Sequence, residues 1–293
     1  MANSIAYVKN YTNILDRVYQ RASVSGCLTS GRRMVQAGRN AKEIMVPKIE
    51  VTGLGDYTRN VGYKTGSITY EFETKTFNYD RGIKLLADVM DVEEAGVLDC
   101  FVEAGSELQR TQVAPEADAF TFAQIAGHTG VTTDDADLSE AEAVDVLAKL
   151  REVTSAMDEA QVTTGSRYLF ITPTLKGVLD DYSYANPTMS NRVLERFARV
   201  VEVPQVRFYT KISLNSGASK FGYEKASAGK DINFMVVEKS AVIKFDKHVA
   251  SRVFSPDELE DLDSYMMKYR KYGIVELLDN KLDGVYVSTA PSA

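Results

Sequence analysis

Few side chains in this sequence are suited to acid–base, metal or nucleophilic chemistry. The chain has two histidines, His128 and His248, and two cysteines, Cys27 and Cys100. The cysteines lie far apart and match no metal or redox spacing, which favours structural thiols in a reducing cytoplasm. His128 follows the expected end of a helix, where a histidine interacts favourably with the helix dipole, and His248 belongs to an alternating segment typical of a surface strand. These positions predict neither a zinc site nor a histidine-based catalytic centre.

The usual motifs for phosphate and cation binding are also missing. GYEKASAGKD contains a Gly-Lys pair, but Gly222 and Gly229 are too far apart for a phosphate loop, and Asp231 stands where Ser or Thr would bind magnesium. PDELEDLD is dense in carboxylates but lacks the glycine and the spacing of a calcium loop, which favours a solvated or interface-facing turn. The patterns HExxH, CxxC and GxSxG are absent. We therefore expect no cofactor, no metal and no enzyme activity.

Composition and charge place the chain among globular proteins with one unusual segment. The 293 residues are 44% hydrophobic and 26% charged, which is ordinary for a soluble protein. The sequence has neither an apolar run long enough for a transmembrane helix nor a secretory signal at its start. Residues 1–42 carry seven basic side chains and one acid, a net +6, so the total of −7 leaves −13 for the rest. This asymmetry predicts a basic arm lying on an acidic surface, with contact to DNA as the alternative.

The elements around these residues begin with that arm and a hairpin. Residues 1–42 are expected to hold one short helix followed by Gly- and Ser-rich chain. Residues 43–51 predict a strand, in which Pro47 requires an edge or an unpaired side. Ile68, Tyr70 and Phe72 then alternate with polar residues, which predicts a second strand with one apolar face. The four glycines between them indicate a loose tip, and an isolated hairpin is marginally stable, so we expect its apolar face to contact something outside it.

Helical and mixed segments follow the hairpin. Residues 91–110 predict a long amphipathic helix with an acidic outer side, extended or restarted over 114–127. Ser139 and Glu142 form a capping-box pattern before a helix whose apolar face starts at Val144. The strand expected over 168–171 and the helix after it predict a mixed α/β domain from about 128 to 240. The last fifty residues return to strands.

The order of these features resembles the major capsid proteins of tailed double-stranded DNA bacteriophages, the Hong Kong 97-type shell fold. It is most similar to capsid proteins of phages and prophages of Gram-positive bacteria. The resemblance rests on YTNILDRVYQRAS, GLGDYTRNVGYKTGSITYEFET, YDRG, DVMDVEEAG, LQRTQVAPEADAFTFAQIA and YRKYG. It covers most of residues 11–126, extends more loosely over 232–288, and matches the middle of the chain by arrangement alone.

The resemblance implies an α+β capsid fold in five parts. These are an N-terminal arm (1–42), an extended β-hairpin loop (43–80), a peripheral domain with a long spine helix (81–127), an inserted axial α/β domain (128–240) and a return to the peripheral domain (241–293). In this family the hairpin and the arm reach onto neighbouring subunits. The implied hairpin contacts are Asp56, Tyr57, Arg59, Asn60, Tyr63, Ile68, Tyr70 and Phe72, with Asp80 and Arg81 at the loop base. The implied arm contacts are Arg17, Arg21, Arg32 and Arg33, and Glu103 and Glu107 lie on the acidic face of the spine helix.

The function implied by the resemblance is that of a shell protein. Its copies would form hexamers and pentamers of an icosahedral virion shell. The shell would assemble in the bacterial cytoplasm, and the protein would have no membrane partner. A portal protein would occupy one vertex, and packaged double-stranded DNA would be contacted weakly and non-specifically. Since about forty residues precede the hairpin, we expect a separate scaffolding protein, with a chain already processed at its start as the alternative. The alternatives are an encapsulin-like nanocompartment and an α/β enzyme centred on 128–240.

Overall fold

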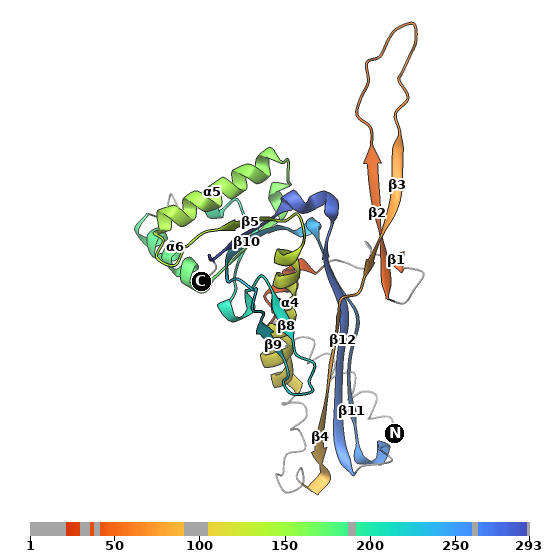
Figure 1. Cartoon of the computed structure of the whole chain (residues 1–293), viewed down its shortest axis with the longest axis vertical. Coiled ribbons are helices and arrows are strands. Elements are labelled where there is room, and N and C mark those ends of the chain that lie inside the picture. The colour runs from red at the N-terminus through yellow and green to blue at the C-terminus, as the bar shows by residue number, and fades with distance from the viewer. Residues whose placement is uncertain are drawn as a thin grey trace.

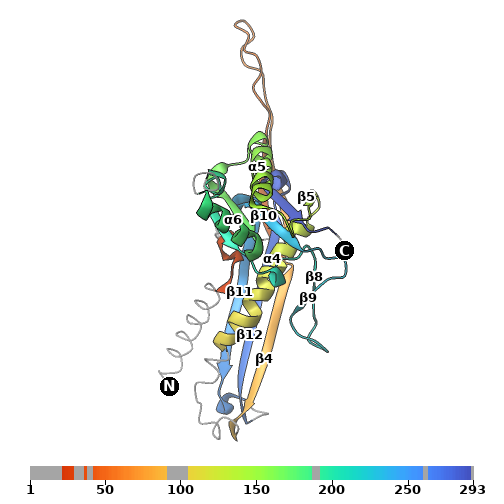
Figure 2. The ribbon, with the colours of Figure 1, turned by 90° about the vertical axis from the view of Figure 1, so that its left-hand side faces the viewer.

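The computed structural model describes residues 22–29, 36–37, 42–90, 105–186, 192–259 and 263–291. The molecule is elongated (Figure 1). A thin hairpin projects at one end, a long sheet extends toward the other, and a compact α/β part lies beside the middle (Figures 1 and 2). Among the described helices, none is long and apolar enough to cross a membrane.

The hairpin consists of β2 (Glu43–Val51) and β3 (Ile68–Thr76), paired antiparallel over nine positions. A third strand, β1 (Gln36–Ala37), pairs with β2 opposite Ile44 and Met45. Pro47 lies beyond this short pairing, so its missing N–H faces a side of β2 on which no described strand pairs. The expectation of one unpaired side at this proline is confirmed.

The long sheet has the order β11-β12-β4. Its strands are β4 (Tyr79–Asp88), β11 (Val242–Phe254) and β12 (Ser264–Leu277), all antiparallel. Along one face runs helical chain: a turn at 105–108, a π-helical segment (Gln109–Val113) and α4 (Ala114–Gly127). Met267 and Tyr269 of β12 pack against Ile83 of β4 and Leu108 of the helical turn. The face of the sheet that carries Met267 and Tyr269 is therefore covered by the helical chain.

The compact part is built on a five-stranded sheet of order β5-β13-β10-β6-β7. Its strands are β5 (Thr132–Asp135), β6 (Arg167–Ile171), β7 (Arg199–Glu202), β10 (Ile232–Glu238) and β13 (Val285–Thr289). Helices α5 (Ala143–Glu159) and α6 (Pro173–Ala185) cover one face and contribute to its core. A small pair, β8 (Ile212–Leu214) and β9 (Tyr223–Lys225), lies near α4.

The last strand departs from the expected organisation. Residues 241–293 are expected to belong together to the peripheral part, but β13 pairs with β10 and β5. Residues 242–277 do return to the long sheet, whereas Val285–Thr289 enters the α/β sheet. The reason is burial, because Val285 and Val287 both belong to the core cluster that contains Phe170 of β6.

The start of α5 also differs from the expectation. Glu142 occupies the N-cap position of α5, and no side chain caps the helix. Ser139 instead donates its hydroxyl to Asp137, at an Oγ–Oδ1 distance of 2.7 Å. The predicted Ser139–Glu142 capping box is therefore wrong, and Val144 is exposed rather than on the apolar face.

Candidate functional site

The side chains first considered for chemistry do not come together. His128 follows α4, with its Nε2 atom 3.6 Å from Oδ1 of Asp279, whereas His248 is exposed on β11 opposite Tyr272. Burial raises the pKa of the Cys27 thiol. Within the residues that the structure describes, no group of three or more His, Cys, Asp and Glu side chains is placed to hold a metal ion. The candidate site is a surface of the hairpin and its base.

The hairpin presents a continuous apolar face that the described chain does not cover. Ile68, Tyr70 and Phe72 of β3 keep 74%, 54% and 46% of their surface exposed. Tyr70 and Phe72 contact each other edge to face, with ring centroids 5.0 Å apart. The residues directly opposite on β2 are apolar as well: Val51, Ile49 and Pro47. A two-stranded apolar surface of this kind is typical of a site of association.

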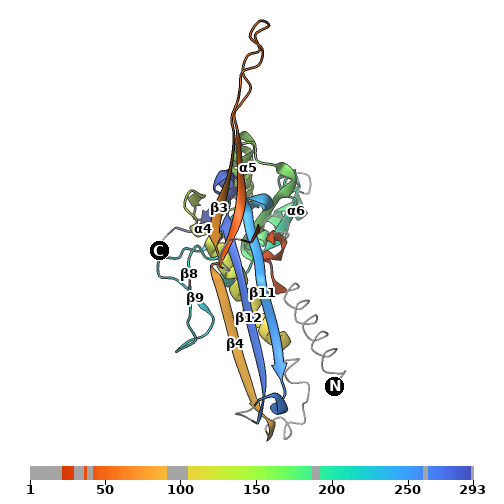
Figure 3. The ribbon, with the colours of Figure 1, turned by 90° about the vertical axis from the view of Figure 1, so that its right-hand side faces the viewer.

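Only the root of the hairpin packs against the rest of the described chain. Ile44 and Val46 point to the other face of β2 and are buried with Ile243 and Ile274 of the long sheet. Because side chains alternate along a strand, the residues that anchor the root leave the apolar face of the distal part turned outward. Figure 3 shows the distal hairpin standing clear of the other elements.

The tip of the hairpin is exposed but has local order. Thr58 accepts backbone hydrogen bonds from Val61 and Gly62, and Gly62 has a φ of +87°, a conformation that favours glycine. The rings of Tyr57 and Tyr63 lie 4.9 Å apart across this turn. The expected contact residues at the tip are all exposed: Asp56, Tyr57, Arg59, Asn60 and Tyr63.

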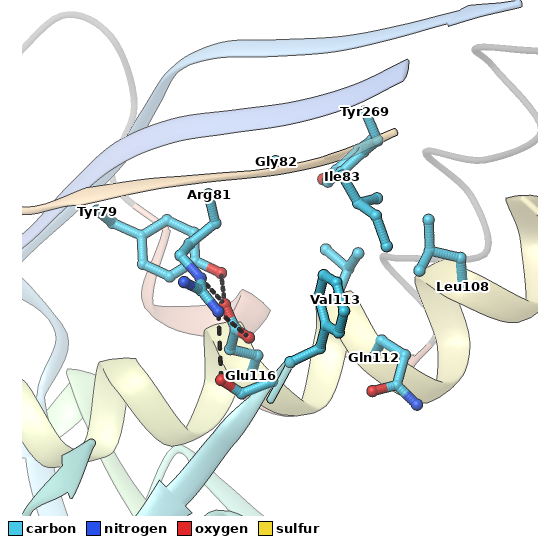
Figure 4. A pocket seen from close by; sticks show the side chains of 11 residues that line it. Tyr79, Arg81, Gly82, Ile83, Leu108, Gln112, Val113, Glu116 and Tyr269 are labelled. Carbon is cyan, nitrogen blue, oxygen red and sulfur yellow. Dashed lines mark hydrogen bonds and ion pairs between the residues drawn. The ribbon is translucent and has the colours of Figure 1, made fainter. Parts of the chain in front are cut away.

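The base of the hairpin is held by two ion pairs on β4. Asp80 accepts hydrogen bonds from the guanidinium of Arg270, with an Nη2–Oδ2 distance of 2.6 Å. Arg81 forms a bidentate pair with Glu116 of α4, at 2.7 Å (Nε–Oε1) and 3.1 Å (Nη2–Oε2) (Figure 4). The hydroxyl of Tyr79 donates to the same carboxylate. These contacts tie β4, the strand that continues the hairpin, to β12 and to α4.

Arg81 also reaches a third element. Its Nη1 and Nη2 atoms donate to the backbone carbonyls of Asn215 and Gly222, at 2.7 and 3.2 Å, in the loop between β8 and β9. The hydrogen bond to Glu116 raises the pKa of Arg81 above its usual value. Sequence reasoning had identified Arg81 but missed Glu116, for which the available signal was a lone Glu early in an apolar helix.

A pocket lies next to this ion pair (Figure 4). Its apolar wall comes from Ile83 and Tyr269 of the sheet and from Leu108 and Val113 of the helical segment. Phe221, which is exposed, also lines it. The pocket is thus a small gap between three elements, with Arg81 and Glu116 as its polar side.

Of the expected contacts outside the hairpin, few lie in the described part. Arg17, Arg21, Arg32, Arg33 and Glu103 lie outside the described residues. Glu107 is exposed and pairs with Arg110, at an Nη2–Oε1 distance of 2.7 Å.

The segment 22–29 of the arm is docked by one buried carboxylate. Asp118 of α4 accepts hydrogen bonds from Ser23, from the backbone of Val24 and from Ser25, and Arg207 lies 3.2 Å from it. Lys244 of β11 donates to the carbonyl of Ser25 at 3.2 Å. Desolvation lowers the pKa of Lys244 to about 8. These contacts attach the start of the described chain to the helix and the long sheet.

Comparison with known proteins finds likeness in structure alone. No protein-family model matches the chain, and no curated protein has a significant sequence match to it. A capsid structure of the cyanophage P-SCSP1u is 15% identical at a TM-score of 0.59, covering 88% of this chain and 86% of that one. The mature capsid of bacteriophage PhiM1 is 14% identical at 0.60, with coverages of 86% and 83%.

A third solved structure extends the likeness over nearly the whole chain. A virus-like particle from Pyrococcus furiosus is 10% identical at a TM-score of 0.60, and the match covers 96% of this chain and 99% of that one. The uncovered remainder of this chain is too short to contain the projecting hairpin, the long sheet or the compact α/β part. The chain therefore has the α+β fold of these phage capsid structures, the Hong Kong 97-like capsid fold.

Proposed function

We propose that this chain is a structural protein whose copies associate into a closed shell. The observation that carries the proposal is the outward apolar face of the hairpin around Ile68, Tyr70 and Phe72. A second copy can cover this face, and symmetric assembly repeats the same contact in every subunit. The similarity in fold to phage capsids and to a virus-like particle supports this function.

In its finer form, the proposal is a major capsid protein of a tailed phage, of the kind found in phages and prophages of Gram-positive bacteria. Its hexamers and pentamers form an icosahedral virion shell around double-stranded DNA, assembled in the host cytoplasm. A separate scaffolding protein directs assembly, and a portal protein occupies one vertex. The basic arm with Arg17, Arg21, Arg32 and Arg33 contacts a neighbouring subunit, and the protein carries no catalytic activity.

The tip of the hairpin fits this role because it combines contact groups with adaptable backbone. Gly53 and Gly62 have open space where a side chain would begin, so neighbours approach the backbone closely. Tyr57, Arg59 and Tyr63 are exposed and supply aromatic and charged contacts. Such a tip fits slightly different neighbours in a hexamer and a pentamer.

Electron microscopy of the purified protein, with and without a co-expressed scaffolding protein, tests this function. We expect capsomers or closed shells in at least one condition. Small compact particles in every condition would refute the proposal. Deletion of 53–66 provides a second test, because it should leave a folded subunit that no longer closes shells, and unfolding of that variant would place the segment in the core.

A second candidate is a nanocompartment shell that carries protein cargo. The match to the virus-like particle of Pyrococcus furiosus, which covers 96% of the chain, is compatible with a shell that is not a virion. The contents of purified shells separate the candidates: nuclease-protected DNA supports the phage capsid, and a stoichiometric co-purified protein supports the nanocompartment. An α/β enzyme centred on 128–240 would leave the hairpin without a role.

A further inference from the structure

Three cations form a row across the face of the long sheet that points away from α4. In the strand register, Arg252 of β11 lies opposite Lys268 of β12, which in turn lies opposite Lys84 of β4. Adjacent strands are about 5 Å apart, so the three side chains leave the sheet at neighbouring points. We call Arg252, Lys268 and Lys84 the cationic row. Figure 3 shows this face of the sheet, with α4 behind it.

The row is electrostatically unfavourable in the isolated chain. Like charges directly opposite each other destabilise a sheet. All three side chains are exposed, and none forms an ion pair with a described residue. Lys268 lies over the ring of Phe254, with its Nζ atom 4.9 Å from the centroid, a contact that leaves its charge uncompensated. A chain with a net charge of −7 thus keeps three adjacent positive charges without a described anionic partner.

The residue rows on either side of the cationic row, on the same face of the sheet, leave room for a partner to bind. On one side Ala250 and Gly82 flank Arg270, whose charge is paired with Asp80. The small residues leave an open hollow of about 670 Å³ that Lys84 and the rest of the cationic row border. On the other side lies an apolar row, Phe254, Met266 and Leu86, in which Leu86 is 47% exposed. The exposed side chain of Leu86 beside the cations favours a protein partner over a phosphate backbone.

The same end of the same sheet carries the opposite charge. Asp88 ends β4, Asp257 and Glu258 follow β11, and Asp263 precedes β12. None of the four forms an ion pair with a described residue, so we call them the acidic end. Lys268 and Ser264, which is paired with Asp88, are four residues apart, or about 13 Å along the strand. The apolar row lies between the two charged groups.

We propose that the cationic row of one copy binds the acidic end of a second copy, so that subunits join head to tail through their long sheets. The inference rests on the proposed assembly function and adds a contact that does not involve the hairpin. Two different, complementary patches on one molecule make a heterologous contact, which closes into a ring when its rotation does. Because the patches lie near one end of the sheet, we expect a small ring of sheet ends around a rotation axis.

Charge reversal tests the contact directly. The row variant Lys84→Glu, Arg252→Glu and Lys268→Glu should lower the yield of shells by about tenfold or more, since like charges brought together at an interface cost several kcal/mol. The end variant Asp88→Lys, Asp257→Lys and Asp263→Lys should fail in the same way. Combining both sets in one chain restores opposite charges across the contact and should recover most of the yield. Shells are counted by electron microscopy and by sedimentation velocity.

Matched controls separate folding, general charge and the proposed contact. Arg151, Arg192 and Lys211 are exposed outside the sheet, and the same three reversals there should leave the yield unchanged. Lys84→Gln, Arg252→Gln and Lys268→Gln check that the subunit still folds, through its thermal midpoint.

The possible outcomes bear on the two proposals differently. If the unmodified protein forms no shells under any condition, the proposed function fails first. If it forms shells and the row variant does so equally well, or if the combined variant is not rescued, the head-to-tail contact is refuted while the shell function stands. Loss of DNA retention with unchanged assembly would assign the cationic row to nucleic acid instead and would also overturn the inference.

Discussion

Replacing the apolar face of the hairpin by threonine is the sharpest test of the assembly function. The variant Ile68→Thr, Tyr70→Thr and Phe72→Thr removes three exposed apolar side chains and keeps a residue that favours strands. Fully burying one such side chain contributes about 1.5–3 kcal/mol. Scaled by the exposed fractions of the three residues, covering this face by a neighbour offers about 3–5 kcal/mol per hairpin.

A loss of that size would weaken each contact by roughly two to four orders of magnitude. Threonine recovers part of the contact and the arm adds its own, so we expect the protein concentration needed for assembly to rise at least about tenfold. Light scattering against protein concentration measures this threshold. The isolated subunit should keep its thermal midpoint, because the side chains replaced do not contribute to its core.

The polar face of the same strand supplies the matched control. Thr69 and Glu71 alternate with the replaced residues and are exposed, and Thr69→Ser with Glu71→Gln should leave the threshold unchanged. The reasoning is refuted if the threonine variant assembles at the original threshold. It is also refuted if the thermal midpoint of the subunit falls steeply, since that would show that the face is packed within the chain.

Three further predictions concern buried charges. Arg167 is 1% exposed, lies 2.7 Å from Asp158 and donates to the backbone carbonyls of Thr154 in α5 and Val162 beyond it. Arg167→Met should therefore lower the free energy of unfolding by about 3–5 kcal/mol in denaturant titration, and a change below about 1 kcal/mol would contradict this. Arg81→Gln should lower the free energy of unfolding by about 1–3 kcal/mol and speed amide hydrogen exchange in the loop between β8 and β9. Unchanged exchange there would show that Arg81 does not hold that loop. The pKa of Lys244 is lowered to about 8 in the folded protein. Between pH 8 and the ordinary pKa of lysine, the unfolded chain therefore binds more protons than the folded one. The free energy of unfolding should rise with pH in that window, by up to about 3 kcal/mol. Lys244→Met should remove this rise, and an unchanged pH profile in that variant would exclude Lys244 as its origin.

The hairpin could be anticipated because its determinants are local. Alternation over Ile68–Phe72 and the glycines of the tip depend on neighbours in the sequence, and both act through backbone geometry that a short segment already sets. Pro47 was equally informative, since a missing N–H restricts pairing wherever the strand lies. The start of α5 was missed although it is local, because Ser139 found a nearer partner in Asp137 than the backbone of the helix.

The partners of charged side chains could not be anticipated in the same way. Arg81 was placed at the base of the hairpin, but Glu116 and the carbonyls near β9 become its partners only when three elements meet. The last strand shows the same limit, because Val285–Thr289 suits either sheet by pattern and joins the one in which Val287 is buried.

The sequence by itself determined the segments with alternating apolar residues, the turns at glycine and proline, and the basic arm. These features already indicate a hairpin that lacks a core of its own. Tertiary structure alone decided which surfaces remain uncovered and which charges stand together. The cationic row illustrates the reason: Lys84, Arg252 and Lys268 are remote in the chain and become neighbours through strand register, which long-range pairing sets. Local preferences act within a few residues, whereas an interface is defined by what folding brings side by side and leaves open.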